Sequence, residues 1–504
     1  MRPGTYRSLD IGSGVRVNAR RFPGKEAVRR GDHVLSYGAL GARMNRVTHA
    51  SEAAGVGRGA NAAILSANVP EYFEVVAGAS ATGAAVATVN PNQTVGELKA
   101  ILEDCDARLV FCDAANAEKV HEAADVPVHV FGHSYEDWLA QASDRDPGGL
   151  PEEWETFAIP YTSGTTGKPK GVCLPHRSRV VSFLVFASVY GCFGIDDRFL
   201  VTTPLFHGGG FAFPMATLFL GGAVELMSGY SPGALARLIG EGRHSGTFVV
   251  PTQFHGMFDL PETEQARLSC HGFRSVICNA APLPEETKLV ALDRLGAGVL
   301  HETYGSTEGG VITNLAPVDM LRKQNCAGRP IAGQDVRLLD DAGEPVAVGN
   351  IGELFSNGPT LFNGYWNRPA ETEASFHGDW FSAGDLARMD DEGYVYIMDR
   401  KKDMILSGGV NIYPREIEEV LFTLPGVTEA AVIGVPDAHW GEAVCAYVRA
   451  DTQRPPEDSL LAACREKLAP HKVPKAIRFI DTIPRNVAGK VMKRELRDRW
   501  GQGS

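Results

Sequence analysis

The sequence predicts an α/β protein: a large N-terminal domain of layered α/β sheets with a β-rich subdomain, followed by a small α+β C-terminal domain. Helical patterns alternate with short apolar runs from about residue 20 to 113, as in a largely parallel sheet. From 333 to 400 the pattern changes to short alternating strands and turns, and the charged run DRKKD at 399–403 precedes the last unit. A chain of 504 residues is long enough for several such units.

The first predicted elements surround a glycine-rich loop. The apolar runs NAAILSA and AAVATVN are predicted strands, and the polar segment 142–155 is a predicted loop. FAIPY at 157–161 is a predicted buried strand that runs directly into the glycine-rich loop. A helix is predicted after that loop, with Val181, Leu184, Val185 and Ser188 on its apolar face.

Four more strands are predicted at 199–206, 246–252, 274–281 and 299–305. Each ends in small or polar residues, as expected where a sheet presents its loops to a ligand. The apolar segment 208–227 is interrupted by Pro214, by glycines and by Glu225, which favours a buried segment over a membrane span.

The last hundred residues have the pattern of a separate α+β unit. Pro414 is predicted to open a helix with acidic residues in its first turns. Strands at 429–436 and 443–450, a helix through 459–469 and a final basic helix from Lys490 complete it. The predicted domains are therefore 1–399 and 400–504.

Composition and charge exclude several classes of protein. A net charge of -12 argues against a nucleic-acid binder, which needs clustered positive surface. Nine cysteines without a CxxC pair indicate neither a disulfide framework nor a zinc site. The N-terminus has no apolar segment behind its charges, so no signal peptide is predicted. We expect a cytoplasmic protein without a membrane span.

The loop YTSGTTGKPKG at 161–171 combines glycines, hydroxyls and lysines. Backbone N–H groups of such a turn approach a phosphate closely, while hydroxyls and ammonium groups add hydrogen bonds and charge, so the loop suits a polyphosphate. It is not a Walker A loop, because only two residues separate Gly164 from the Gly167-Lys168 pair.

Together with the motifs that follow it, this loop resembles the adenylate-forming superfamily, in particular acyl-CoA synthetases such as fatty-acyl-CoA and 4-coumarate-CoA ligases. The resemblance runs from KEAV at 25 to MKREL at 492–496. It implies that the loop holds the β- and γ-phosphates of ATP, with Lys168 nearby. The residues implied in this contact are Thr162, Ser163, Gly164, Thr165, Thr166, Gly167 and Lys170.

The resemblance also assigns the rest of the nucleotide site. In ETYGSTEGG at 302–310, Tyr304 offers a flat face to adenine, Thr307 a hydroxyl to the α-phosphate, and Glu308 an oxygen ligand to Mg²⁺. Asp385 in WFSAGD is implied to accept from the ribose hydroxyls, and Arg400 to donate to the same sugar. Further nucleotide contacts are implied for Ala280, Ala281, Pro282 and Gly305.

In the family pattern, Lys490 of PRNVAGK bridges the substrate carboxylate and the α-phosphate. The chemistry needs such a cation, because two anions approach each other and negative charge builds up on phosphorus. The implied catalytic residues are Lys490, Thr307, Glu308 and His207. The same pattern resembles the family's lysine-acetylation site, and acetylation would remove the required charge.

The implied reaction has two half-reactions in one site. A carboxylate and MgATP give acyl-AMP and pyrophosphate, and the thiol of coenzyme A then takes the acyl group. A C-terminal lid that pivots near Lys402 would serve both steps. Ser407, Gly408 and Gly409 match the strand edge that lines the pantetheine tunnel in the family.

The acyl pocket is implied around PLFHGGGF at 204–211. His207 replaces the Asp that amino-acid-activating relatives carry, which favours an acid without an α-amino group, and its implied role is to steer substrate and gate the thiol tunnel. The glycines suggest open volume for a long or bulky group, whereas the polar Asn279 suggests a shorter or more polar pocket, so chain length stays open. The predicted lining is His207, Gly208, Gly209, Asn279, Gly305 and Gly309.

Several alternatives remain. VPTQFHG lacks the Arg of dicarboxylate-activating relatives, which speaks against malonate. The acceptor is either CoA or the phosphopantetheine of a carrier protein, and a luciferase-like oxygenase is less favoured. A catalytically silent nucleotide-binding protein is disfavoured by the presence of Lys490, Glu308, Asp385 and Arg400. Expected partners are small molecules; the oligomeric state stays open, with a homodimer as one alternative.

Overall fold

The computed structural model describes residues 9–148, 151–163, 169–451, 454–485 and 491–501. Its first sheet has the strand order β6-β5-β3-β4-β7-β8, with β9 on β7, and is parallel from β6 to β7. The strands are β3 (Asn61–Leu65), β4 (Val86–Val89), β5 (Ala107–Cys112), β6 (Val128–Val130), β7 (Thr156–Ser163), β8 (Pro169–Gly171) and β9 (Leu174–Pro175). Its helices are α2 (Tyr37–Ala53), α3 (Glu71–Ala79), α4 (Val95–Asp104), α5 (Ala117–Ala123) and α6 (Ser134–Ala140).

The second sheet has nine strands in the order β16-β15-β14-β13-β12-β10-β11-β1-β2. They are β1 (Glu26–Arg30), β2 (His33–Ser36), β10 (Arg198–Val201), β11 (Ala223–Leu226), β12 (Gly246–Val249), β13 (Ser275–Cys278), β14 (Leu300–Ser306), β15 (Gly310–Leu315) and β16 (Arg329–Pro330). The accompanying helices are α1 (Ser13–Arg21), α9 (Pro232–Gly240), α10 (Pro251–Phe258), α11 (Glu262–Gln265) and α12 (Glu285–Leu295).

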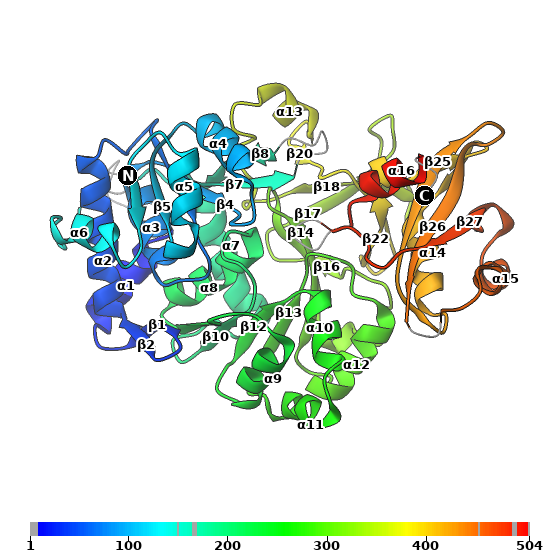
Figure 1. Ribbon diagram of the computed structural model, residues 1–504, viewed down its shortest axis with the longest axis horizontal. Coiled ribbons are helices and arrows are strands. Elements are labelled where there is room, and N and C mark those ends of the chain that lie inside the picture. The colour runs from blue at the N-terminus through cyan, green and yellow to red at the C-terminus, as the bar shows by residue number, and fades with distance from the viewer. Residues whose placement is uncertain (1–8, 149–150, 164–168, 452–453, 486–490, 502–504) are drawn as a thin grey trace.

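Helices α7 (His176–Tyr190) and α8 (Gly208–Leu220) lie between these two sheets (Figure 1). Their buried side chains join one core that includes Phe111 of β5 and Phe199 of β10. The predicted apolar face of α7 is wrong, because Leu184 is 51% exposed while Phe183 and Phe186 are buried. The apolar spacing marks the side on which Leu184 and Ser188 are exposed, so it does not identify the buried side of this helix.

The β-rich subdomain appears where the sequence predicts it, as an antiparallel sheet of β17 (Asp335–Leu339), β18 (Ile351–Asn357), β19 (Phe376–His377), β20 (Trp380–Phe381), β21 (Asp385–Met389) and β22 (Val395–Arg400), with α13 (Pro369–Ala374) beside it. In the pair β21–β22, Asp385 lies opposite Arg400. Two residues predicted to bind one sugar are thus brought together by strand register.

The C-terminal part has its own sheet and cores (Figure 1, orange to red). Its strands are β23 (Ile405–Ser407), β24 (Val410–Ile412), β25 (Val427–Asp437), β26 (Gly441–Ala450) and β27 (Ala476–Phe479), and its helices are α14 (Pro414–Phe422), α15 (Glu457–Lys467) and α16 (Lys493–Gly501). The last helix starts at Lys493 rather than at Lys490, which lies outside the described residues. The exact domain boundary stays a prediction.

The layered α/β class is confirmed. The apolar segment 208–227 forms α8 and β11, both buried, and within the described ranges no helix is long and apolar enough to cross a membrane. All nine cysteines are free thiols, and only Cys270 is exposed.

Candidate active site

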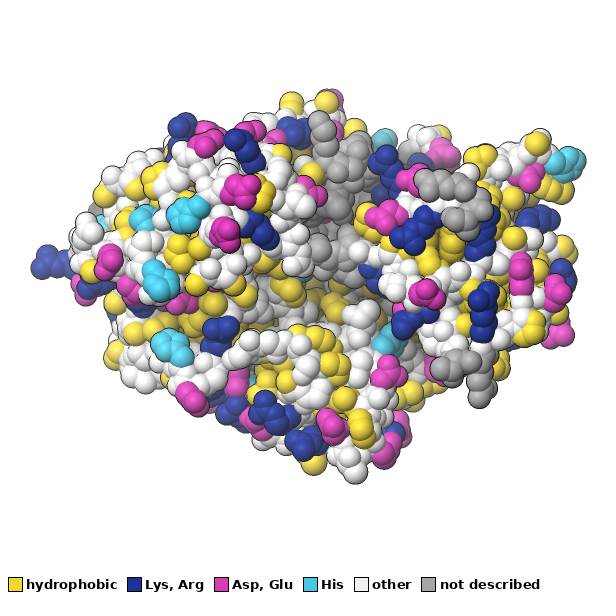
Figure 2. Space-filling view, in the orientation of Figure 1, with side chains coloured by type: hydrophobic (Ala, Val, Ile, Leu, Met, Phe, Trp, Pro, Cys, Tyr) yellow, Lys and Arg dark blue, Asp and Glu magenta, His cyan; other side chains and the backbone are white. Residues whose placement is uncertain are grey.

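One cavity of about 1050 Å³ lies where β10, β12, β13 and β14 end, beside α7, the start of α8 and the C-terminal domain. Figure 2 shows the surface hollowed between the N-terminal sheets and the C-terminal domain. Ligand sites of open α/β sheets lie at these carboxyl ends, since the loops that follow the strands converge there. Predicted site residues that line the cavity are Thr162, Lys170, His207, Gly208, Gly209, Asn279, Ala280, Gly305, Thr307, Glu308, Arg400 and Lys402.

Other predicted residues do not line it. Tyr304 and Asp385 are not lining residues, although Gly305 and Ala383 near them in the chain are, and Gly309 is buried and donates its N–H to Ser306 Oγ. Outside the lining are also Ala281, Pro282, Ser407, Gly408 and Gly409. The predictions for Gly164, Thr165, Thr166, Gly167, Lys168 and Lys490 fall outside the described residues, as does the side chain of Ser163.

Asp385 is the centre of a three-residue contact. Tyr304 Oη donates to Asp385 Oδ2 at 2.7 Å, and Arg400 Nε contacts Asp385 Oδ1 at 2.6 Å. Arg400 Nη1 also donates to Ala383 O at 2.9 Å. Burial and the neighbouring Asp385 raise the pKa of Tyr304, so its hydroxyl keeps its proton and remains a donor. The arrangement fixes a carboxylate and a guanidinium beside the cavity, as a ribose site requires.

Glu308 and Lys170 lie around the ring of Tyr365. Tyr365 Oη donates to Glu308 Oε1 at 2.9 Å, and the Lys170 ammonium lies 5.2 Å from the Tyr365 ring centroid. Lys170 also forms an ion pair with Glu371. Lys170, predicted to bind phosphate, and Glu308, predicted to bind the metal, thus both contact Tyr365.

The donor set suits Mg²⁺. Glu308 has one carboxylate oxygen bonded to Tyr365 and lines the cavity. Among the described residues, no group of three or more His, Cys, Asp or Glu side chains could enclose a metal ion. Mg²⁺ commonly takes one or two carboxylates and fills its other positions with water and phosphate oxygens, so a single glutamate beside a nucleotide is sufficient.

Three contributors were missed by sequence reasoning: Tyr365, Glu371 and Arg179. Arg179 lines the cavity from α7, is 4% exposed and donates through Nη2 to Thr307 O at 2.7 Å. Burial lowers the pKa of Arg179 to about 10, while nearby Glu308 opposes this shift. Arg179 follows Arg177 in the first turn of α7 and precedes the apolar part of the helix, so its sequence position did not distinguish a buried arginine from an exposed one.

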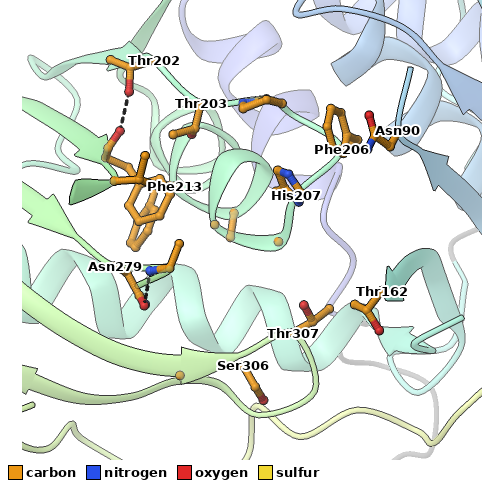
Figure 3. Close-up of a pocket in the computed structure, with 18 of the residues that line it drawn as sticks. Asn90, Thr162, Thr202, Thr203, Phe206, His207, Phe213, Asn279, Ser306 and Thr307 are labelled. Carbon is orange, nitrogen blue, oxygen red and sulfur yellow. Dashed lines mark hydrogen bonds between the residues drawn. The ribbon is translucent and has the colours of Figure 1, made fainter. Parts of the chain in front are cut away.

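His207 and the glycines after it form the opening of the predicted acyl pocket (Figure 3). His207 precedes the first turn of α8. A Cβ on Gly208 would have nothing closer than 3.8 Å, whereas one on Gly210 would lie 2.0 Å from Pro204 O. Gly208 therefore borders open space, while Gly210 permits close backbone packing, so the idea that all three glycines leave open volume holds only in part.

Asn279 forms part of the opposite wall. Its Oδ1 accepts from the N–H of Ala280 at 2.6 Å, and Ala280 has a left-handed φ of 78°. Figure 3 shows Asn279 across the open space from His207. The side-chain carbonyl therefore stabilises its own turn in the wall of the cavity.

The C-terminal domain reaches the cavity through Lys402 and Arg485. Arg485 Nη2 donates to Glu429 Oε2 at 2.8 Å. Gly408 and Gly409 have φ values of 58° and 79°, and a Cβ on Gly408 would lie 2.8 Å from the Trp440 ring. The Ser407–Gly409 turn thus packs within its own domain in this arrangement.

Comparisons with known proteins show the family of this chain. A family model described as AMP-binding enzyme matches residues 15–366, and one described as AMP-binding enzyme C-terminal domain matches 416–490. A feruloyl-CoA synthase of an Amycolatopsis species is 38% identical, over 98% of this chain and 100% of that protein. A fatty acid–[acyl-carrier-protein] ligase, ScoC of Streptomyces coeruleorubidus, is 33% identical over 97% and 98%.

Among solved structures, ATP-bound MatB from Rhodopseudomonas palustris has a TM-score of 0.88 at 30% identity, covering 96% of this chain and 99% of that one. The apo form of MatB gives a TM-score of 0.77 at 31% identity, covering 97% and 99%. The arrangement of this chain therefore superposes better on the ATP-bound form.

The predicted family, and with it the predicted use of ATP, Mg²⁺ and CoA, is confirmed at the level of the family. The residues predicted for the nucleotide and those predicted for the acid line one cavity. The chain belongs to the AMP-binding enzyme family, within the adenylate-forming superfamily, and is an AMP-forming acid–thiol ligase.

Proposed function

We propose that this enzyme is an acyl-CoA ligase that activates a carboxylic acid without an α-amino group. The acid attacks the α-phosphate of ATP to give acyl-AMP and pyrophosphate, and the CoA thiol then displaces AMP to give the thioester. The observation that carries this proposal is the continuous cavity from Glu308 and Arg400 to His207 and Gly208.

The charges around the cavity favour anionic substrates. Lysines and arginines line it from both domains, namely Arg30, Lys170, Arg179, Arg400, Lys402 and Arg485, whereas Glu308 is the only acidic side chain among the described lining residues. Clefts lined by one sign of charge attract counter-charged ligands. With His207 in place of a carboxylate, no described acid at the acyl opening is present to pair with an α-ammonium group.

The residues divide the work of the first half-reaction. The carboxylate of Asp385 and the guanidinium of Arg400 would hold the ribose, and the hydroxyl of Thr307 would orient the α-phosphate. Arg179 donates a hydrogen bond to the backbone carbonyl of Thr307 and so holds that residue in position. Bound Mg²⁺ would neutralise phosphate charge, and Lys490, outside the described residues, is proposed as the cation between the two reacting anions.

A carrier-protein phosphopantetheine is the second candidate acceptor. The ScoC relative is a ligase for an acyl-carrier protein, and both acceptors end in the same thiol arm. We favour CoA because the feruloyl-CoA synthase matches at higher identity, 38% against 33%, over 98% of this chain.

The test is acid-dependent pyrophosphate release across alkyl, aryl, hydroxycinnamic and amino acids, with CoA, with a phosphopantetheinylated carrier protein, or with neither thiol. We expect release with some non-amino acid and an acyl-CoA product by mass, both lost in Lys490→Ala. If only the carrier protein is acylated, the acceptor is the carrier protein and not CoA. Absence of turnover with every acid would contradict the ligase and favour a silent nucleotide binder.

We further propose that the domains pivot at Lys402, which lies in the 3₁₀ turn Lys401–Asp403 between β22 and β23. The Ser407–Gly409 turn lies outside the cavity lining, so a rotation is needed if it is to line a thiol tunnel. Lys402→Pro would stiffen this turn. In Lys402→Pro we expect acid-dependent pyrophosphate exchange to persist and the rate of thioester formation to fall at least about tenfold. Lys401→Ala is the control. Equal loss of both steps in Lys402→Pro would contradict the hinge.

A further inference from the structure

The inner end of the acyl region is closed by aromatic rings. Phe186 of α7, Phe213 of α8 and Phe248 of β12 line the cavity together. The ring centroid of Phe213 lies 4.7 Å from that of Phe186 and 5.1 Å from that of Phe248. Helices and a strand that are distant in sequence thus meet in one aromatic floor, which we define as Phe186, Phe213 and Phe248.

A second layer of rings supports this floor. Tyr190, Phe193 and Phe199 have ring centroids 5.9, 6.1 and 6.2 Å from that of Phe213. These three do not line the cavity, and all six rings are 7% exposed or less. Protein interiors are close-packed, so turning Phe213 aside would require neighbouring rings to move as well.

The side of the pocket near its opening is less filled. Gly208 borders open space, and a Cβ on Gly209 would lie 3.0 Å from the ring of Phe248. Figure 3 places Phe213 on the same wall as Asn279, across the open space from His207. The pocket therefore offers width beside Gly208, is tight between Gly209 and Phe248, and ends at aromatic faces.

We propose that Phe213 sets the length limit of the acyl pocket, so that the enzyme prefers a compact aromatic acid and discriminates against long saturated chains. This inference rests on the proposed acid-activating function. An aromatic group fits a wide, short pocket, and aromatic rings favour one another through offset or edge-to-face contact. A long alkyl chain would have to displace the two-layer ring cluster.

The test compares Phe213→Ala and the milder Phe213→Leu with Phe183→Ala. Phe183 is a matched control because it is fully buried on α7, contacts the Phe219 ring and does not line the cavity. The kcat/KM of acyl-AMP formation is measured for straight-chain acids from acetate to palmitate and for single-ring and cinnamic acids.

Wild-type enzyme is expected to favour aromatic over long-chain acids. Phe213→Ala should shift the ratio of medium-chain to aromatic kcat/KM by about tenfold or more, because a pocket change of one or a few methylenes commonly changes discrimination by that much. Phe213→Leu should shift it in the same direction, and Phe183→Ala should leave the ratio unchanged.

Equal wild-type activity on palmitate and aromatic acids would overturn the inference, as would the same shift in Phe183→Ala. Both results leave the enzyme an acid-activating ligase. Failure of wild-type enzyme to release pyrophosphate with any acid would instead refute the proposed function.

Discussion

At the scale of single residues, Asp385 has the most constrained side chain of the proposed nucleotide site. Its two oxygens are oriented by Tyr304 and Arg400, and the side chain is almost fully buried. Asp385→Ala should raise the Kd for ATP roughly ten- to a hundredfold, since hydrogen bonds to charged groups contribute about 1.5–3 kcal/mol.

Calorimetric titration of ATP measures this change. Tyr304→Phe is the matched variant, because it removes one donor but keeps the carboxylate and its ion pair. We expect a smaller loss there. Unchanged ATP affinity in Asp385→Ala would mean that the contact is structural only.

Glu371 competes for the proposed phosphate lysine. Its carboxylate pairs with Lys170, and both side chains are partly exposed, at 38% and 17%. Such a pair contributes about 0–1 kcal/mol, so Glu371→Gln should tighten ATP binding by no more than about fivefold while Lys170→Ala weakens it. The same titrations provide the measurement, and weaker binding in Glu371→Gln would show that the glutamate assists the nucleotide instead.

The residue scale also shows what sequence reasoning can recover. Thr307, Glu308, Asp385 and Arg400 stand in short motifs, and the order of these motifs along the chain is sufficient to identify them. Arg179 cannot be identified in this way, because its function depends on contact with a carbonyl 128 positions away in the chain. A motif is visible in a short stretch of sequence, whereas a contact between distant residues forms only when the chain folds.

At the scale of elements, the start of α8 depends on one glycine. A Cβ at Gly210 would overlap the carbonyl of Pro204, so Gly210→Ala should destabilise the protein by about 1–3 kcal/mol and displace His207. Gly208→Ala is the matched control, since its Cβ would enter open space. Thermal unfolding measures the melting temperature of both variants, and we expect a lower value for Gly210→Ala. An equal melting temperature for the two variants would contradict the predicted overlap.

Helix α7 illustrates the limit of pattern reading for an element. Its existence and length follow from the sequence, but its buried side was predicted wrongly. Its exposed side carries the apolar Leu184, while Phe183 and Phe186 are buried together with the polar Ser178 and Ser182. Periodicity identifies the buried face of a helix only when the apolar side chains are confined to that face.

At the scale of the whole molecule, buried histidines should make stability depend on acidity. Burial lowers the pKa of His176 to about 3 and that of His301 to about 4. Below about pH 6.5 each of these histidines takes up a proton in the unfolded chain but not in the folded protein. The free energy of unfolding is therefore fully present above that pH. It decreases by about 1.4 kcal/mol per pH unit and per histidine until the pH reaches the pKa of the histidine in the folded protein.

The measurement is the melting temperature of wild type, His176→Gln and the exposed-site control His439→Gln at about pH 7 and about pH 5. We expect the difference between the two pH values to shrink in His176→Gln and to persist in His439→Gln. The comparison between variants matters because Glu74, whose pKa burial raises to about 7, contributes with the opposite sign. A wild-type-like difference in His176→Gln would contradict the assignment.

The arrangement of whole sheets was only partly predictable. The alternation of strands and helices gave the layered class, and motif order gave the family. The position of β1 and β2 was not accessible, because they come early in the chain yet complete the second sheet beside β11. A strand's partner depends on long-range pairing, which local patterns do not encode.

The buried cysteines have a chemical consequence for such an enzyme. Burial raises the pKa of Cys173 and Cys192 to about 12 and that of Cys278, which directly precedes Asn279 in the chain, well above its usual value. A thiolate is the reactive form, so these side chains stay protonated at neutral pH. These three buried thiols are therefore poor nucleophiles toward an activated acyl group, and none of them lines the cavity.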